Sequence, residues 1–158
     1  MLCNRKSITA NVLVFLICLT LVFIWGNSML GREQSADVSN GLLEFIRPAL
    51  ESLGLNCETD HWLRKLAHFC EFALLGAEFS ALWALETKRS MWDLSRSALY
   101  CLGVAVMDET IQYFSGRYPH ILDVMLDFSG SICGIAVFCA VFAAVVKYKE
   151  KMFKFRCL

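Results

Sequence analysis

The run ITANVLVFLICLTLVFIWGNSML, from Ile8 to Leu30, contains no charged residue. An α-helix needs about 20 predominantly apolar residues to cross the hydrocarbon core of a bilayer. Arg5 and Lys6 precede the run, as basic residues precede the apolar segment of a cleavable signal peptide. The run is longer than the roughly 7–15 apolar residues of such a segment, and no A-x-A cleavage site follows it. We therefore expect residues 8–30 to form an uncleaved transmembrane helix.

Three further segments after this run combine apolar stretches with a few charged residues. We predict that they form helices at residues 64–85, 97–114 and 121–146. Such segments fit a membrane if their charged side chains face the interior of a helix bundle rather than lipid. Apolar residues at roughly helical spacing within 39–54 indicate a helix in the outer interface, although a packed extracellular loop is the alternative. The predicted fold is all-α, an integral membrane bundle of four transmembrane helices, with one domain over residues 1–158.

The composition agrees with a membrane protein. Of the 158 residues, 57% are hydrophobic and 19% are charged, which is too apolar for an ordinary soluble domain. The formal net charge is zero and there is no basic tract, so nothing indicates binding to nucleic acid. The eight cysteines occur singly, without a C-x-x-C pair, and most lie in apolar segments. We interpret them as structural residues rather than as a disulfide framework.

Basic residues predict how the chain is oriented. They occur before the first span, in the link between spans two and three, and in the tail after span four. The segment between spans one and two is mainly acidic. Because cytoplasmic segments of membrane proteins are enriched in Lys and Arg, we expect a multi-pass protein with both termini in the cytoplasm.

The predicted topology brings polar residues from three segments to the same depth, near the outer surface. These residues are Arg64, Lys65, His68 and Glu71, then Asp108, Glu109, Gln112 and Arg117, then Asp123 and Asp127. The spacing of Arg64, His68 and Glu71 places them on one helix face. Asp123, Asp127, Gly130 and Gly134 also share a face, on which the two glycines would permit close helix packing.

Charged groups within a membrane helix cost about 2.5–3.5 kcal/mol each at the bilayer centre, so they are expected to pair or to have a function. In the purely structural interpretation, Arg64, Lys65 and Arg117 neutralise the carboxylates and lock the bundle. In the functional interpretation, the acid, base or proton-linked groups are His68, Glu71, Glu109 and Asp123. The ligand-binding groups would then be Arg64, Lys65, Asp108, Gln112, Arg117 and Asp127.

No motif identifies a reaction, since the chain has neither a G-x-S-x-G elbow nor an H-E-x-x-H box. Whether the chain is an enzyme therefore stays open. A divalent cation would require four or more side chains to converge from the set His68, Glu71, Glu109, Asp123 and Asp127. We accordingly predict no metal and no cofactor.

Three blocks of the sequence resemble the VanZ-like family. They are RKLAHFCEFALLG (64–76), DETIQYFSGR (108–117) and DVMLDFSGSICG (123–134), and their order and spacing match that family over about residues 60–140. The polar residues named above, together with Gly130, are the positions that the resemblance carries over. Ser115 is a departure, because the family often has proline there, and it puts the rigidity of that loop in doubt. The family consists of small bacterial membrane proteins, one of which gives low-level resistance to teicoplanin.

The resemblance implies a protein of the bacterial cell envelope. We expect it to bind or modify a lipid-linked or amphipathic molecule at the outer leaflet, with membrane lipid, a peptidoglycan precursor or a glycopeptide antibiotic as partner, and to give tolerance to lipoglycopeptides such as teicoplanin. One alternative is a membrane-embedded acid/base enzyme that acts on an envelope precursor. A non-catalytic scaffold or a transporter subunit is another, and a transporter would need a homo-oligomer or a partner because four spans leave little room for a path.

Overall fold

The fold is described from a computed structural model that covers residues 2–31, 34, 36–37, 40–41, 44–45, 47–48, 52, 60–85, 91–118 and 120–156. Within these residues the architecture is all-α, as predicted, and contains no strand. The long helices are α1 (Leu2–Met29), α3 (Asp60–Ala84), α4 (Met91–Phe114) and α5 (Ile121–Arg156). Each overlaps one predicted segment. Helices α1, α3 and α4 begin four to six residues earlier than predicted, and α5 continues beyond residue 146. The proposed interfacial helix at 39–54 falls largely outside the described residues.

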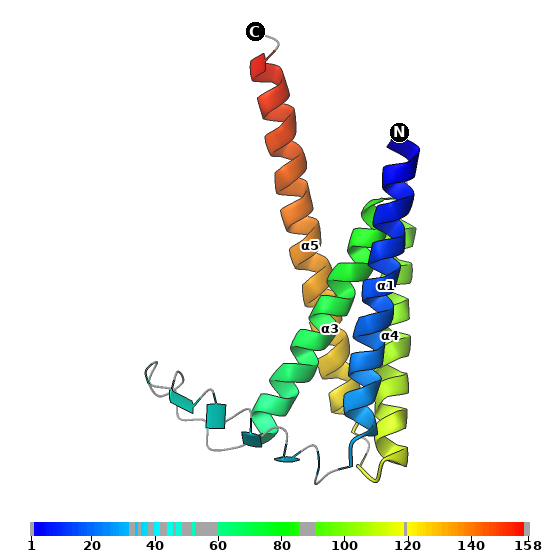
Figure 1. Ribbon diagram of the computed structural model, residues 1–158, viewed down its shortest axis with the longest axis vertical. Coiled ribbons are helices and arrows are strands. Elements are labelled where there is room, and N and C mark those ends of the chain that lie inside the picture. The colour runs from blue at the N-terminus through cyan, green and yellow to red at the C-terminus, as the bar shows by residue number, and fades with distance from the viewer. Residues whose placement is uncertain are drawn as a thin grey trace.

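The helices alternate in direction along the bundle (Figure 1). The beginning of α1 and the end of α5 lie at one end of the molecule. At the opposite end, α1 and α4 finish and α3 and α5 begin. We call this second end the polar end, because the ionisable residues singled out in the sequence belong to it. The later half of α5 diverges from the other helices.

Two of the helices are long and apolar enough to cross a membrane. The qualifying stretches are Lys6–Met29 in α1, with a mean hydropathy of 2.5, and Ile121–Phe153 in α5, with a mean hydropathy of 2.3. Both stretches are largely exposed, and large side chains such as Phe15, Val22 and Val141 form their surface. Exposed apolar surface of this extent is typical of contact with lipid or with another protein. The two helices indicate a membrane protein.

Helices α3 and α5 approach each other more closely than ordinary side chains would allow. A Cβ atom added to any of three glycines in these helices would collide with a backbone carbonyl oxygen of the other helix. The contacts join Gly76 to Ser131, Gly130 to Phe69, and Gly134 to Ala73. Small residues at such spacing are the usual means by which membrane helices come into backbone contact. We call this contact the glycine seam.

The apolar core lies next to the polar end, on its side toward the bundle centre. Its buried side chains come from α1, α3 and α4, and they are Ile17, Ile24, Phe72, Leu75, Cys101 and Ala105. Ile24, Leu75 and Ala105 lie about one turn along their helices from the polar residues Ser28, Glu71 and Asp108 respectively. The core therefore borders the polar region on its side toward the bundle centre.

Candidate functional site

A pocket of about 290 Å³ opens at the polar end between α3, α4, α5 and the loop that joins the last two. Its lining residues are Arg64, Lys65, His68, Gln112, Arg117, Tyr118, His120, Asp123, Leu126 and Asp127. Seven of these residues were candidates from the sequence, and they come from three separate segments of the chain. Antiparallel neighbours thus bring distant parts of the sequence to one cavity.

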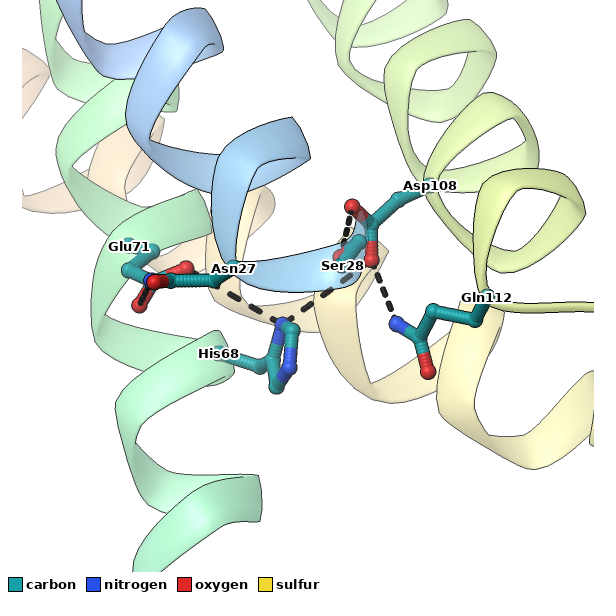
Figure 2. A network of polar contacts seen from close by, with 6 residues as sticks. All are labelled: Asn27, Ser28, His68, Glu71, Asp108 and Gln112. Carbon is teal, nitrogen blue, oxygen red and sulfur yellow. Dashed lines mark hydrogen bonds and ion pairs between the residues drawn. The ribbon is translucent and has the colours of Figure 1, made fainter. Parts of the chain in front are cut away.

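Asp108 lies beneath the pocket and is completely buried. Ser28 Oγ donates a hydrogen bond to Asp108 Oδ1 over 2.6 Å, and Gln112 Nε2 donates to Oδ2 over 2.6 Å. His68 Nδ1 is 3.9 Å from the same Oδ2 atom (Figure 2). Side chains from α1, α3 and α4 therefore meet at a single carboxylate. Hydrogen bonds to a carboxylate are short and strong, so they fix its orientation.

Glu71 flanks His68 on the other side. Asn27 Nδ2 donates to Glu71 Oε1 over 3.2 Å, and His68 Nδ1 lies 3.9 Å from Glu71 Oε2. Figure 2 shows the imidazole of His68 directed toward the space between Glu71 and Asp108. The ring nitrogen Nδ1 is buried and has no hydrogen-bond partner among the described residues. This is a histidine between two oriented carboxylates.

The polar residues of α1 are not among the candidates from the sequence, which all lie between residues 64 and 134. Three polar residues of α1 each donate a hydrogen bond to a carboxylate. Besides Asn27 and Ser28, Thr20 Oγ1 donates to Glu78 Oε1 over 3.1 Å. Thr20 and Asn27 are seven residues apart and share the face of α1 toward α3, whereas Ser28, about 100° around the helix from Asn27, bonds to α4. Polar residues at that spacing inside an apolar span were the signal that could have identified them.

The rim of the pocket is basic. Lys65 Nζ forms an ion pair with Asp123 Oδ1 at 2.9 Å, and both side chains are about one-third exposed. Arg64 and Arg117 also line the cavity. A partly exposed pair of this kind contributes little to stability, about 0–1 kcal/mol, because water and salt screen it. The Lys65 ammonium can therefore exchange its partner for an anionic ligand.

The end of α4 determines where Arg117 lies. Gly116 has a positive φ of 80°, and the amides of Gly116 and Arg117 donate to the carbonyl oxygens of Tyr113 and Gln112. This pattern is a Schellman motif, which closes a helix with a glycine in the left-handed conformation. Ser115, where the family often has proline, donates to the Ile111 carbonyl through both its amide and its hydroxyl. The loop is thus held by hydrogen bonds that proline could not make.

Glu109 is buried but does not line the pocket. Its Oε1 atom accepts a hydrogen bond of 2.6 Å from the backbone amide of His120. This contact ties the end of α4 to the residue before α5. The functional interpretation of the sequence assigned Glu109 an acid or base role. Its observed contact instead positions the loop beside the pocket.

A cluster of three residues could hold a metal ion. One ligand atom from each of His68, Asp108 and Asp127 lies within 4.8 Å of the other two. His68 and Asp127 belong to the set that the sequence offered for a cation, whereas Asp108 does not. Glu71, Glu109 and Asp123 of that set are outside the cluster.

The chemistry available in the pocket combines a basic rim with an acidic floor. The floor can exchange a proton or coordinate a cation, because it contains an imidazole and two carboxylates. The rim can bind a phosphate or carboxylate through its guanidinium and ammonium groups. No cysteine in the described part of the chain lines the cavity, which agrees with a structural role for these thiols.

Comparison with known proteins gives one match. Neither the curated proteins nor the solved structures contain a match to this chain. The family model described as VanZ/LLP1 matches residues 12–143. The matched region includes most of α1 as well as α3, α4 and the first part of α5, so it covers every helix that contributes to the site. The protein belongs to the VanZ-like family.

Proposed function

We propose that the protein is a multi-pass protein of the bacterial cell membrane that binds the anionic head group of a lipid-linked or amphipathic molecule at the outer leaflet. The single observation that carries this proposal is the pocket at the polar end, with Arg64, Lys65 and Arg117 among its lining residues. Peptidoglycan precursors, anionic lipids and lipoglycopeptide antibiotics all present phosphates or carboxylates at that surface. Membership of the VanZ-like family supports an envelope protein.

The proposal requires four spans. Helices α3 and α4 have 25 and 24 residues. At a rise of 1.5 Å per residue such helices are about 36 Å long, enough for a hydrocarbon core of about 30 Å. Their ionisable side chains Glu71, Glu78 and Asp108 face the bundle interior, as expected of charged residues within a membrane. The basic tail after residue 146 supports a cytoplasmic end for α5.

Labelling tests this topology. Both termini should be cytoplasmic, so the segment between spans one and two, which contains Cys57, should be outside the cell. A membrane-impermeant thiol reagent should therefore modify Cys57 in intact cells. Fusions of a reporter to the C-terminus should be active in the cytoplasm alone. A C-terminus on the exterior would place the pocket at the inner leaflet and would contradict the proposed site of action.

Native mass spectrometry of the purified protein tests ligand binding. We expect a lipid or precursor to co-purify with the wild-type protein and to be lost from Arg64→Gln and Arg117→Gln. Lys149→Gln is the matched control, because Lys149 is exposed in the distant part of α5. Retention of the ligand by both arginine variants, or its equal loss from the control, would contradict head-group binding at the pocket.

We also propose that the protein gives tolerance to lipoglycopeptides. A lipidated drug is concentrated at the membrane, where each buried methylene contributes about 0.8 kcal/mol. Expression in a susceptible Gram-positive host should therefore raise tolerance to teicoplanin more than to vancomycin, which lacks the lipid chain. Dose–response curves for the two drugs test this expectation. Equal tolerance to both would contradict protection at the membrane surface.

A membrane-embedded acid/base enzyme is the second candidate. The specific observation in its favour is His68, whose Nδ1 atom lies 3.9 Å from a carboxylate on either side. Such an arrangement is typical of a general base with orienting partners. Mass spectrometry of envelope precursors should then reveal a modified product on expression of the wild type, and none with His68→Gln. An unchanged precursor pool would leave binding, or a non-catalytic scaffold, as the function.

A further inference from the structure

We propose that His68, Asp108 and Asp127 bind a divalent transition-metal ion, with Zn²⁺ as the best fit, at the floor of the pocket. The three residues come from α3, α4 and α5, so the ion would join three helices at the polar end. The site differs from the basic rim, where the head group is proposed to bind. It does not depend on that proposal, because the ligand atoms of the cluster include no residue of the rim.

The spacing of the ligand atoms is close to that of a metal site. One imidazole nitrogen and two carboxylate oxygens lie within 4.8 Å of one another, and His68 Nδ1 is 3.9 Å from Asp108 Oδ2. Zinc–ligand bonds of about 2.0–2.2 Å place tetrahedral ligand atoms about 3.4 Å apart. Small side-chain rotations would close the difference. The glycine seam holds α3 and α5 in contact, so His68 and Asp127 are kept at this spacing by the backbone.

Asp127 gives the independent evidence for a ligand. Only 2% of its surface is exposed. Its carboxylate has no hydrogen-bond or ion-pair partner in the part of the chain that the structure describes. The side chain is directed into the cluster and lines the pocket. A buried carboxylate without a partner is costly, and it is expected to be neutralised by a proton or to coordinate a metal.

Lys65, which lines the same pocket, forms its ion pair with Asp123. The neighbouring cluster member Asp108 adds a second carboxylate rather than a compensating positive charge. The two carboxylates repel each other unless a cation or protons lie between them, and the imidazole nitrogen is available as a third ligand. A divalent ion satisfies all three groups at once.

The surroundings orient the ligands as partners of metal ligands do. Ser28 and Gln112 each donate to one oxygen of Asp108, and each oxygen retains a further lone pair. Such hydrogen-bonded partners fix ligating groups in metalloproteins. The mixed nitrogen and oxygen set favours Zn²⁺ or Mn²⁺ over Ca²⁺ and Mg²⁺, which prefer oxygen alone. Three protein ligands leave a coordination position directed at the pocket.

Metal content and metal-dependent stability test the site in the full-length protein in detergent. The protein is stripped with a chelator, titrated with Zn²⁺, and analysed by elemental mass spectrometry and thermal unfolding. We expect about one tightly bound Zn²⁺ per chain and an increase in Tm on binding, because a ligand of the folded state alone stabilises it. Asp127→Asn should weaken Zn²⁺ binding by at least about 10–100-fold, the loss seen when even an outer partner of a ligand is removed.

Matched variants make the result decisive. Glu150→Gln changes an exposed carboxylate in the distant part of α5, outside the cluster, and should leave Zn²⁺ binding unchanged. Arg117→Gln should also retain the metal, so failure of head-group binding and failure of the metal site are distinguishable.

The Tm of metal-free Asp127→Asn reports whether that variant is folded. Ser28→Ala provides a second variant, which should weaken Zn²⁺ binding through Asp108. Wild-type protein that binds no Zn²⁺, or equal binding by wild type and Asp127→Asn, would overturn the proposal and leave shared protons as the neutralising charge.

Discussion

The two sides of α3 are attached to the bundle in different ways. On one side, the glycine seam brings the α3 and α5 backbones into direct contact at three positions. On the other side, α1 packs apolar side chains against α3 and contacts Glu71 and Glu78 through single hydrogen bonds from Asn27 and Thr20. Backbone contact tolerates no added atom, whereas a hydrogen bond can be lost at modest cost. The seam therefore determines the fold, and the polar contacts determine how the ionisable groups are presented.

Enlarging a seam glycine should have the largest effect. In Gly134→Leu the new side chain would overlap the backbone of Ala73, and the helices would have to separate. Overpacking costs about 1–3 kcal/mol and occasionally more, and direct backbone contact places this variant at the upper end. Thermal unfolding in detergent and the yield of folded protein should both fall sharply.

Gly103→Ala is the matched control for that experiment. Gly103 lies in α4 and has nothing within 4 Å of an added Cβ. Alanine in a helix interior is favoured over glycine by up to about 1 kcal/mol, so this variant should be as stable as the wild type or slightly more stable. Equal destabilisation by the two changes would mean that the seam does not govern the fold.

The two glutamates of α3 that bond to α1 offer the next comparison. Glu71 is beside His68 at the polar end, whereas Glu78 lies two turns deeper and bonds to Thr20. Glu71→Gln should return teicoplanin tolerance to the level of cells without the protein, because it removes a carboxylate beside His68. Glu78→Gln should retain tolerance, because the amide oxygen can still accept from Thr20. Equal loss in both variants, accompanied by equal loss of folded protein, would favour a scaffold role for the polar residues.

Several features of the fold and of the pocket were predictable from the sequence. Apolar runs predicted a helix in each of the four segments that are helical, and the topology predicted that Arg64, Lys65, His68, Gln112 and Asp123 would share one region. Helical spacing also predicted that Gly130 and Gly134 share a packing face, and both lie in the seam. These features depend on periodicity and direction alone, which a single sequence contains.

Other features depend on which helices are neighbours, and periodicity does not specify this. Asn27 and Ser28 become site residues because α1 lies beside α3 and α4. Asp108 and Glu109 are adjacent in sequence and therefore about 100° apart around the helix, so one faces the bundle interior and the other faces the loop before α5. The choice between them is made by packing. The continuation of α5 to Arg156 reflects the absence of glycine or proline after residue 146.

Removing the donor to Asp108 should have an intermediate effect. Ser28→Ala eliminates a buried hydrogen bond of 2.6 Å to a carboxylate. Hydrogen bonds to charged groups contribute about 1.5–3 kcal/mol, so the free energy of unfolding should fall by that amount. Chemical denaturation in detergent measures it, with Ser7→Ala at an exposed position of α1 as the control. A change within about 0.5 kcal/mol of the control would mean that water replaces the serine, and that the polar end is more hydrated than its burial indicates.

The ion pair at the rim should have the smallest effect. Lys65 and Asp123 connect α3 to α5, as the seam does, but their side chains are about one-third exposed. A double-mutant cycle with Lys65→Met and Asp123→Asn should give a coupling of about 0.2–1 kcal/mol, as for other exposed pairs. The coupling should fall further in 1 M salt, where charges are screened beyond about 3 Å. A coupling well above this range that persists in salt would place the rim in a medium of low dielectric. Lys65 would then be a structural partner of Asp123 rather than a group that exchanges it for a ligand.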